Sequence, residues 1–304
     1  IYIFRDAENR MLYVGKSIKI RQRIKSHLQA RDDTHPRLMR MYRTVHSVDW
    51  IETRSELLAL LLEDGLIKSE QPLYNKRQKN QKAYRYLTFS SEKYPRLKII
   101  DEHQRNSFIK WYGPFYDRFK AGEMVDLLHH LVPLRTCADS EPKRKCLKGQ
   151  IGQCLAPCKI ESRDHYVQYV DQVNAWLSGH QDPGAFINTA IAKFSKSQKF
   201  RHAQFIHEKK GLLFEFQRRQ AFIKYFVTKD MTLQCLNSGL TIHFLKGQID
   251  TIESDKGESF HKLLYQSMTE SQRYDRAVII YGWLKKASDQ ASCCFYDTGF
   301  CVEY

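Results

Sequence analysis

The first 80 residues alternate between short strand-like runs and helical patterns, and this order limits the folds that the chain can adopt. Residues 1–4 and 11–15 are strand-like and flank a polar stretch, which predicts a β-hairpin. Apolar residues then recur at every fourth position over residues 20–28, which predicts a basic amphipathic helix. A third strand is expected around residues 45–51. Such an order predicts a small antiparallel sheet with flanking helices.

A capped helix follows the third strand. Thr53 and Glu56 stand at capping-box spacing in front of the apolar run 57–66, which predicts that the helix begins here. Pro72 lies shortly after the expected end of this helix. Residues 1–82 are therefore predicted to form a small α/β domain with a three-stranded antiparallel sheet, in a chain of the α+β class.

The rest of the chain divides by composition into three further parts. Residues 83–160 hold two strand candidates and four closely spaced cysteines, and residues 161–225 have a basic, helical pattern. Residues 226–304 read as a mixed α/β region, with strand candidates at 240–245 and 277–281. The chain begins at Ile1 without a Met, so we expect residues upstream of it.

The charge of the chain points to a polyanionic partner. Its 304 residues hold 49 Lys and Arg against 34 Asp and Glu, a net charge of +15, which suits nucleic acid. A hydrophobic fraction of 42% excludes global disorder. No apolar run approaches the ~18 residues that span a bilayer, and the start does not resemble a secretory signal. We therefore expect no membrane contact.

Four of the eight cysteines crowd together in the spacing C-x8-C-x7-C-x3-C. In a chain with no other mark of secretion, this density favours a metal or cluster site over disulfides, which remain the alternative. Only the last pair has the spacing of a zinc knuckle, whereas iron–sulfur ligation tolerates wider intervals. The four are Cys137, Cys146, Cys154 and Cys158. The later cysteines (235, 293, 294 and 301) are interpreted as small buried apolar residues.

Several polar residues of the first domain fit a phosphodiester site. Tyr13 and Gly15 share one face of the hairpin by the period-two rule, and Arg23 and His27 share one face of the following helix. Glu63 directly follows an apolar stripe. A carboxylate can hold a hard divalent cation that stabilises developing phosphate charge. Packing tyrosines and a solvated glutamate are the alternative interpretation.

The sequence resembles a known family at this point. Ile1-Tyr2 followed by Tyr13-Val14-Gly15-Lys16 is similar to the paired signature of the GIY-YIG nuclease superfamily, with the opening glycine absent. The likeness extends to the UvrC family of bacterial excision-repair endonucleases, and is closer still to its shorter member Cho. The segments that carry it are SIKIRQRIKSHL, LLLEDGLIK, QPLYN, WYGPF and CLKGQIGQCLAPC.

This resemblance implies roles for the hairpin residues. Tyr2 would shape the site by hydrogen bonding near the attacking water, and Tyr13 would be the general base. Because an unperturbed phenol has a pKa near ~10, its deprotonation is costly. Lys16 beside it would lower that cost, and Gly15 would permit close packing.

The resemblance also implies roles for the helical residues. Arg23 would bind the scissile phosphate as a fork of donors, and His27 would hydrogen-bond the phosphate or assist proton transfer. Glu63 would be the one protein ligand to Mg²⁺ or Mn²⁺, with waters filling the other positions. Asn75 would orient the site by hydrogen bonding.

The implied function is structure-specific cutting of damaged double-stranded DNA in nucleotide excision repair, by a single metal-dependent incision on the 3′ side of the lesion. Relatives carry a helical hairpin that docks on UvrB, but the corresponding stretch here, residues 200–210, departs from the usual charge pattern. The cysteines would hold a 4Fe-4S cluster, with zinc as the alternative. A monomer in the bacterial cytoplasm, at the nucleoid, is expected. A binding module that does not cut, or a homing or restriction-type nuclease, are the alternatives.

Overall fold

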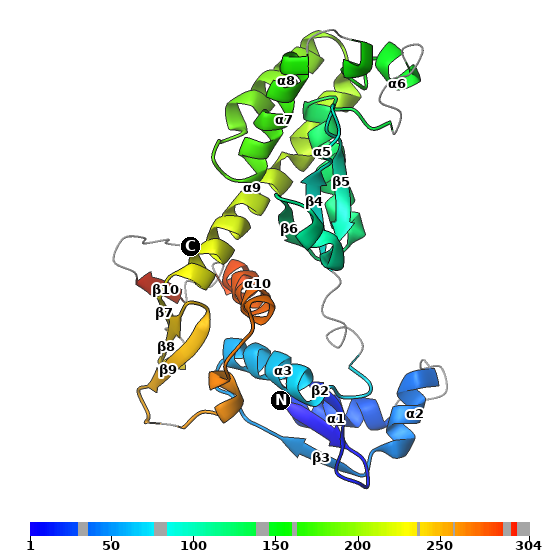
Figure 1. Cartoon of the computed structure of the whole chain (residues 1–304). Helices are drawn as coiled ribbons and strands as arrows, with labels where there is room; N and C mark the ends of the chain where they lie inside the picture. The colour runs from blue at the N-terminus through cyan, green and yellow to red at the C-terminus, as the bar shows by residue number, and fades with distance from the viewer. Residues whose placement is uncertain are drawn as a thin grey trace. The chain divides into compact units, whose positions relative to one another are not determined.

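A computed structural model describes residues 1–29, 36–75, 84–137, 146–159, 163–235, 238–257, 259–287 and 293–296. The chain forms two compact units, residues 1–82 with 222–304, and residues 83–221. The α+β class is confirmed (Figure 1). The four-part division expected from the sequence stays a prediction. None of the helices in the described ranges is long and apolar enough to cross a membrane.

The first unit begins with the predicted small domain, and its three-stranded antiparallel sheet is confirmed. The strand order is β2-β1-β3, with Tyr2 of β1 opposite both Gly15 of β2 and Trp50 of β3. A register shift after Phe4 turns Leu12 toward the same face as Tyr2. The elements are β1 (Tyr2–Arg5), β2 (Met11–Gly15), α1 (Ile20–Leu28), α2 (Pro36–Thr44), β3 (Ser47–Trp50) and α3 (Glu56–Glu70).

Helix α3 begins where the sequence predicts, but with a different cap. The side chain of Ser55, and not of Thr53, accepts the hydrogen bond from the Leu57 backbone N–H at 3.2 Å. Thr53 was therefore the wrong cap residue. The cap lies two residues later, at Ser55, whose hydroxyl accepts the same kind of hydrogen bond. Gln71 ends the helix in the left-handed region, one residue before Pro72.

The two faces of this sheet pack against different partners. Tyr2 and Phe4 lie on the face covered by α1 and α2, with Met41 buried beside them. Ile1, Ile3 and Val14 lie on the other face, against the leucines of α3. The alternation of strand side chains thus separates an aromatic layer from an aliphatic one.

The C-terminal part of the same unit shares the aliphatic core. A four-stranded sheet of order β10-β7-β8-β9 and the helix α10 contribute Leu233, Ile242 and Ile280 to it. The strand expected at 277–281 is instead the middle of α10, since a short continuous apolar run does not distinguish a buried strand from a buried helix. The elements are β7 (Met231–Cys235), β8 (Leu240–Leu245), β9 (Gln248–Ser254), the 3-10 helix η4 (Lys262–Tyr265), α10 (Glu270–Ala287) and β10 (Cys293–Tyr296).

The second unit packs helices on a three-stranded antiparallel sheet of order β5-β4-β6. Its core holds Leu87, Leu127, Trp176 and Ile206. The segment WYGPF supplies β6. The elements are β4 (Arg85–Phe89), β5 (Leu97–Asp101), the 3-10 helix η1 (Glu102–Ser107), β6 (Tyr112–Phe115), α5 (Arg118–Leu131), α6 (Leu147–Gln150), the 3-10 helix η2 (Pro157–Lys159), α7 (Arg163–Leu177), α8 (Gly184–Lys196) and α9 (Phe200–Thr228), which runs on into the first unit.

A charged cluster joins α3 to α10 in the first unit. Lys68 bridges Asp64 at 2.7 Å and Asp275 at 2.8 Å, and all three side chains are at most 17% exposed. Burial lowers the pKa of the adjacent Arg276 to about 10, and the charge of Asp64 opposes this shift. The helix that carries Glu63 is thus held by ion pairs from the C-terminal part of the chain.

Replacing Lys68 with Met is expected to destabilise the protein by about 3–5 kcal/mol, because two carboxylates would lose their shared cation in a nearly dry interface. Arg218→Met, which removes an exposed ion pair with Glu215, is the matched control and should cost less than about 1 kcal/mol. Urea unfolding measures both. Equal losses in the two variants would contradict the role assigned to Lys68.

Candidate active site

The hairpin brings two tyrosines together over a glycine. The ring centroids of Tyr2 and Tyr13 lie 6.0 Å apart, on the sheet face covered by α1. A Cβ at Gly15 would lie 2.5 Å from the Tyr2 hydroxyl and 3.0 Å from the Tyr13 ring. Only glycine therefore lets the two rings sit side by side at this position.

Helix α1 adds a histidine and an arginine to the tyrosines. The Tyr2 hydroxyl and His27 Nε2 are 3.0 Å apart, and the hydroxyl of Tyr42 on α2 is 2.9 Å from His27 Nδ1. Burial, reinforced by the charge of Arg23, lowers the pKa of His27, so the imidazole is neutral at neutral pH. A hydrogen bond with the Tyr2 hydroxyl raises the pKa of Arg23. Tyr42 was not singled out from the sequence, since it stands among the packing residues of α2 without a distinguishing pattern.

Tyr13 is held in its protonated form. Burial raises its pKa well above the ordinary value of 10, and the neighbouring Tyr2 and Glu63 raise it further. Arg23 is the cation that opposes this shift. Lys16, expected from the sequence to favour the phenolate, instead forms an ion pair with Glu56 at 2.6 Å, because its side chain extends toward the start of α3.

Glu63 approaches the tyrosines from α3. Burial of this largely covered side chain raises the pKa of its carboxyl above 4.5, whereas the charge of Lys16 and a hydrogen bond from the Lys16 backbone N–H lower it. Its charge also acts on Tyr13. Glu63, Tyr13 and Tyr2 thus supply one carboxylate and two phenol oxygens from three elements.

The Glu63 carboxylate suits a hard divalent cation. Among the residues that the structure describes, no group of three His, Cys, Asp or Glu side chains is arranged to hold a metal ion. An ion bound by Glu63 would therefore keep water or substrate oxygens at most of its positions, and the single-carboxylate site stays a prediction.

Asn75 forms two hydrogen bonds with β2, the outer strand of the hairpin. Its Oδ1 accepts from the Val14 N–H at 2.9 Å, and its Nδ2 donates to the Val14 carbonyl at 2.7 Å. Both bonds are buried, and Val14 lies between Tyr13 and Gly15 in the chain. Asn75 therefore fixes the strand that carries the second tyrosine without contacting that tyrosine itself.

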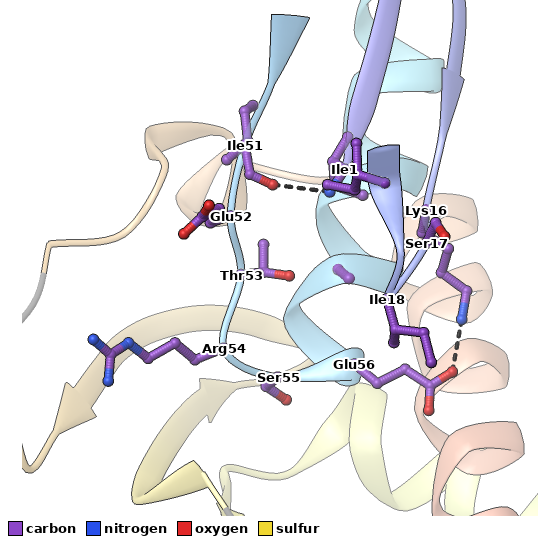
Figure 2. A pocket seen from close by; sticks show the side chains of 12 residues that line it. Ile1, Lys16, Ser17, Ile18, Ile51, Glu52, Thr53, Arg54, Ser55 and Glu56 are labelled. Carbon is purple, nitrogen blue, oxygen red and sulfur yellow. Dashed lines mark hydrogen bonds and ion pairs between the residues drawn. The ribbon is translucent and has the colours of Figure 1, made fainter. Parts of the chain in front are cut away.

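A groove of about 800 Å³ adjoins the site through Lys16 (Figure 2). Its walls come from the turn after β2, including the fully exposed Ile18, and from residues 51–56 that lead into α3. Figure 2 shows the Lys16–Glu56 ion pair along one side of this groove. Both apolar and polar side chains line the groove, and of the candidate site residues it is Lys16 that lies in its wall.

The four clustered cysteines belong to the second unit. Burial raises the pKa of the Cys154 thiol, and the charges of Cys146, Cys137 and Cys158 raise it further, so these three lie within electrostatic reach of Cys154. They nevertheless do not make a three-ligand metal group in the described part of the chain. The soft thiol set fits iron–sulfur or zinc chemistry by donor type.

A buried arginine supports the backbone beside these cysteines. Arg135 has no exposed surface, pairs with Glu92 at 2.7 Å and donates to the Cys137 carbonyl at 3.2 Å. Of the later cysteines, Cys235 is buried in the shared core, which confirms the apolar interpretation for this residue. The side chains of residues 293 and 294, and residue 301, lie outside the described part.

Two family models match this chain in succession. The UvrC-like GIY-YIG domain matches residues 1–76, and the UvrC/Cho excinuclease middle domain matches residues 84–176. Together they cover more than half of the chain. No solved structure matches significantly.

The match to curated relatives includes most of this chain, but the chain spans less than half of the length of those relatives. The UvrABC system protein C of Methanothermobacter thermautotrophicus is 35% identical over 222 residues, 72% of this chain and 38% of its own. The protein of the same name from Acinetobacter baylyi is 32% identical over 249 residues, 79% of this chain and 41% of its own. Because the two domain models occur in this order and such relatives extend the match to residues beyond them, the chain belongs to the UvrC family of GIY-YIG proteins.

Proposed function

We propose that this chain is a DNA endonuclease of nucleotide excision repair that makes a single incision on the 3′ side of a lesion in double-stranded DNA. The observation that carries the proposal is the convergence of Tyr2, Tyr13, Arg23 and Glu63 from a hairpin and two helices. Relatives that bear the name UvrABC system protein C support the pathway.

We propose Mg²⁺ or Mn²⁺ as the cofactor, held by Glu63. When bound, such an ion stabilises negative charge on the phosphate in the transition state. Arg23 would bind the same phosphate through its exposed guanidinium. The same guanidinium is hydrogen-bonded to the Tyr2 hydroxyl.

A hydrogen-bonded chain would carry the proton from the attacking water. Tyr13 bonds to Tyr2, and Tyr2 bonds to the neutral His27, whose second nitrogen is held by Tyr42. Because Tyr13 keeps its own proton at neutral pH, it can take up the proton of the water only as it passes its own proton along this chain. His27 would be the acceptor at the end of the chain.

The acid limb of the pH profile tests the part of Glu63. Since burial raises its pKa, cutting should be lost as the pH falls through a value above 4.5. Lys16→Met removes a charge that lowers this pKa, so it should move the acid limb to higher pH. Lys19→Met, at an exposed lysine three residues away, should leave the limb in place. Single-turnover cutting rates against pH measure the shift, and an unmoved limb in Lys16→Met would contradict this electrostatic role.

We propose that the thiols of Cys137, Cys146, Cys154 and Cys158 hold a 4Fe-4S cluster, with zinc as the alternative. Anaerobic purification followed by iron, sulfide and zinc analysis distinguishes the two. About four irons with matching sulfide per chain are expected. One zinc and no sulfide would support the alternative, and neither metal would contradict both.

We propose the bacterial nucleoid in the cytoplasm as the location, a monomer as the working form and UvrB as the loading partner. The stretch 200–210 would be the docking surface, but Ala203 and Ile206 are buried in the second unit. Only its exposed side, which includes Phe200, is available for docking.

The decisive experiment uses a duplex with one bulky lesion, end-labelled on each strand in turn, with Mg²⁺ or Mn²⁺ and with UvrA and UvrB present or omitted. A single metal-dependent nick 3′ to the lesion is expected. Salt-sensitive binding without any cutting would instead indicate a binding module. Cutting at a fixed sequence without a lesion would indicate a homing or restriction-type nuclease.

A further inference from the structure

Trp50 exposes 64% of its surface at the end of β3. Trp176, by contrast, is fully buried, and Trp111 and Trp283 are partly covered. An indole ring offers a large, flat apolar area, so an exposed ring on an ordered strand presents a free surface for a planar ligand.

The register of the sheet sets Trp50 beside the candidate active site. Tyr2 lies directly opposite Trp50 on one side and Gly15 on the other. Residues directly opposite in an antiparallel pair have their Cβ atoms about 4.5–5.5 Å apart and on the same face. Val48 packs with Tyr2 and Ile51 packs on the opposite face, which agrees with this placement. Because β3 is an edge strand, no further strand in the described part of the chain covers the outer flank of Trp50.

The charges of the neighbouring helix suit a phosphate backbone. Residues 16–28 hold five Lys and Arg and no Asp or Glu, and of these five Lys16 is already paired with Glu56. Asp49, next to Trp50, is paired with Arg5 at 2.6 Å, so its charge is offset. An aromatic surface close to cationic side chains is the combination that binds unpaired nucleic acid strands.

We propose that Trp50 stacks on an unpaired nucleobase next to the phosphate held by Arg23. Arg23 contacts Tyr2 from α1, and Trp50 stands beside Tyr2 in β3, so the two flank the same tyrosine. A base inside a duplex has both faces covered by its neighbours, and only an unstacked base can lie on the ring. This inference rests on the proposed DNA substrate and adds a preference for locally opened DNA.

Binding measured in a Glu63→Gln background, which keeps the DNA intact, tests the stacking. The probes are a fully paired duplex and the same duplex with a short unpaired bubble containing 2-aminopurine. Trp50→Ala should weaken binding of the bubble roughly 5- to 150-fold, equivalent to about 1–3 kcal/mol, and leave duplex binding nearly unchanged. Trp50→Tyr should restore most of the affinity. Phe119→Ala, at a ring that is 70% exposed in the other unit, is the matched control and should change neither.

Intrinsic fluorescence gives a second readout that does not depend on affinity alone. Bubble DNA should quench the tryptophan emission of the parent, and Trp50→Phe should remove most of this quenching, because Trp176 is buried and Trp111 and Trp283 are partly covered. Equal weakening on both DNAs, or unchanged quenching in Trp50→Phe, would overturn the stacking proposal.

The binding and cutting activity of the parent protein distinguishes a failure of this proposal from a failure of the proposed function on which it rests. A parent that cuts damaged duplex while Trp50→Ala binds the bubble normally would overturn only the stacking. A parent that neither binds nor cuts DNA would overturn both. Thermal unfolding of each variant shows whether the fold is kept.

Discussion

Replacing Glu63 with Gln is expected to slow DNA cutting by roughly 10³-fold or more, while the fold is kept. Glutamine has nearly the same size and can keep the hydrogen bond from the Lys16 backbone N–H, so the loss reports the missing charge. A neutral amide would hold a divalent cation far more weakly than a carboxylate does. DNA binding should persist, because its affinity comes from cationic side chains that the substitution leaves in place.

Single-turnover cutting of an end-labelled duplex over a series of Mn²⁺ concentrations measures this effect. Glu70→Gln is the matched control, since it removes an exposed carboxylate from the last turn of the same helix. It should cut at the parental rate. Full activity in Glu63→Gln would exclude this carboxylate from the reaction and would point to a different centre in the chain.

Replacing Gly15 with Ala should also cause a large loss of cutting rate. The cause is a displaced side chain and not a missing charge. The added methyl group would lie 2.5 Å from the Tyr2 hydroxyl and 2.6 Å from the ring carbon that bears it. The Tyr2 ring must therefore move, which disrupts its 3.0 Å contact with His27. Because a displacement near 1 Å can cost roughly 10²-fold in rate, we expect a loss of that order.

Gly65→Ala is the matched control for the glycine substitution. Its new methyl group would meet only the Leu263 carbonyl, at an ordinary 3.9 Å, and alanine in a helix interior stabilises by about 1 kcal/mol relative to glycine. Cutting should therefore be unchanged. A Gly15→Ala variant that melts normally and cuts at the parental rate would show that the close packing of Tyr2 is not required.

The features predicted well from the sequence are those with short-range patterns. The hairpin and α3 follow from alternating residues, from an apolar run and from nearby cap and proline signals, all within a few residues of one another. Even the error at the helix cap, Thr53 in place of Ser55, was a shift of two residues. The roles of Tyr2 and Arg23 came from resemblance, because nothing local in the sequence shows that their side chains meet.

The features that were missed depend on contacts between distant segments. Tyr42 becomes part of the site only when α2 packs against α1 and its hydroxyl meets His27. The segment 277–281 reads as a strand by composition, but it lies inside the 18-residue helix α10 and packs in the shared core with residues of α3 and of the C-terminal sheet. The ion pair of Lys68 with Asp275 joins residues more than 200 positions apart, which no local pattern indicates.

The packing of α3 has a consequence for work with fragments of this protein. One side of the helix lies on the N-terminal sheet, and the other meets η4 and α10, where Lys68 finds Asp275. A recombinant piece that stops near residue 82 would therefore present leucine side chains to water and would leave Lys68 with Asp64 but without Asp275. Such a piece should aggregate or require a detergent or a fusion partner, and coexpressing residues 222–304 with it should recover a soluble complex.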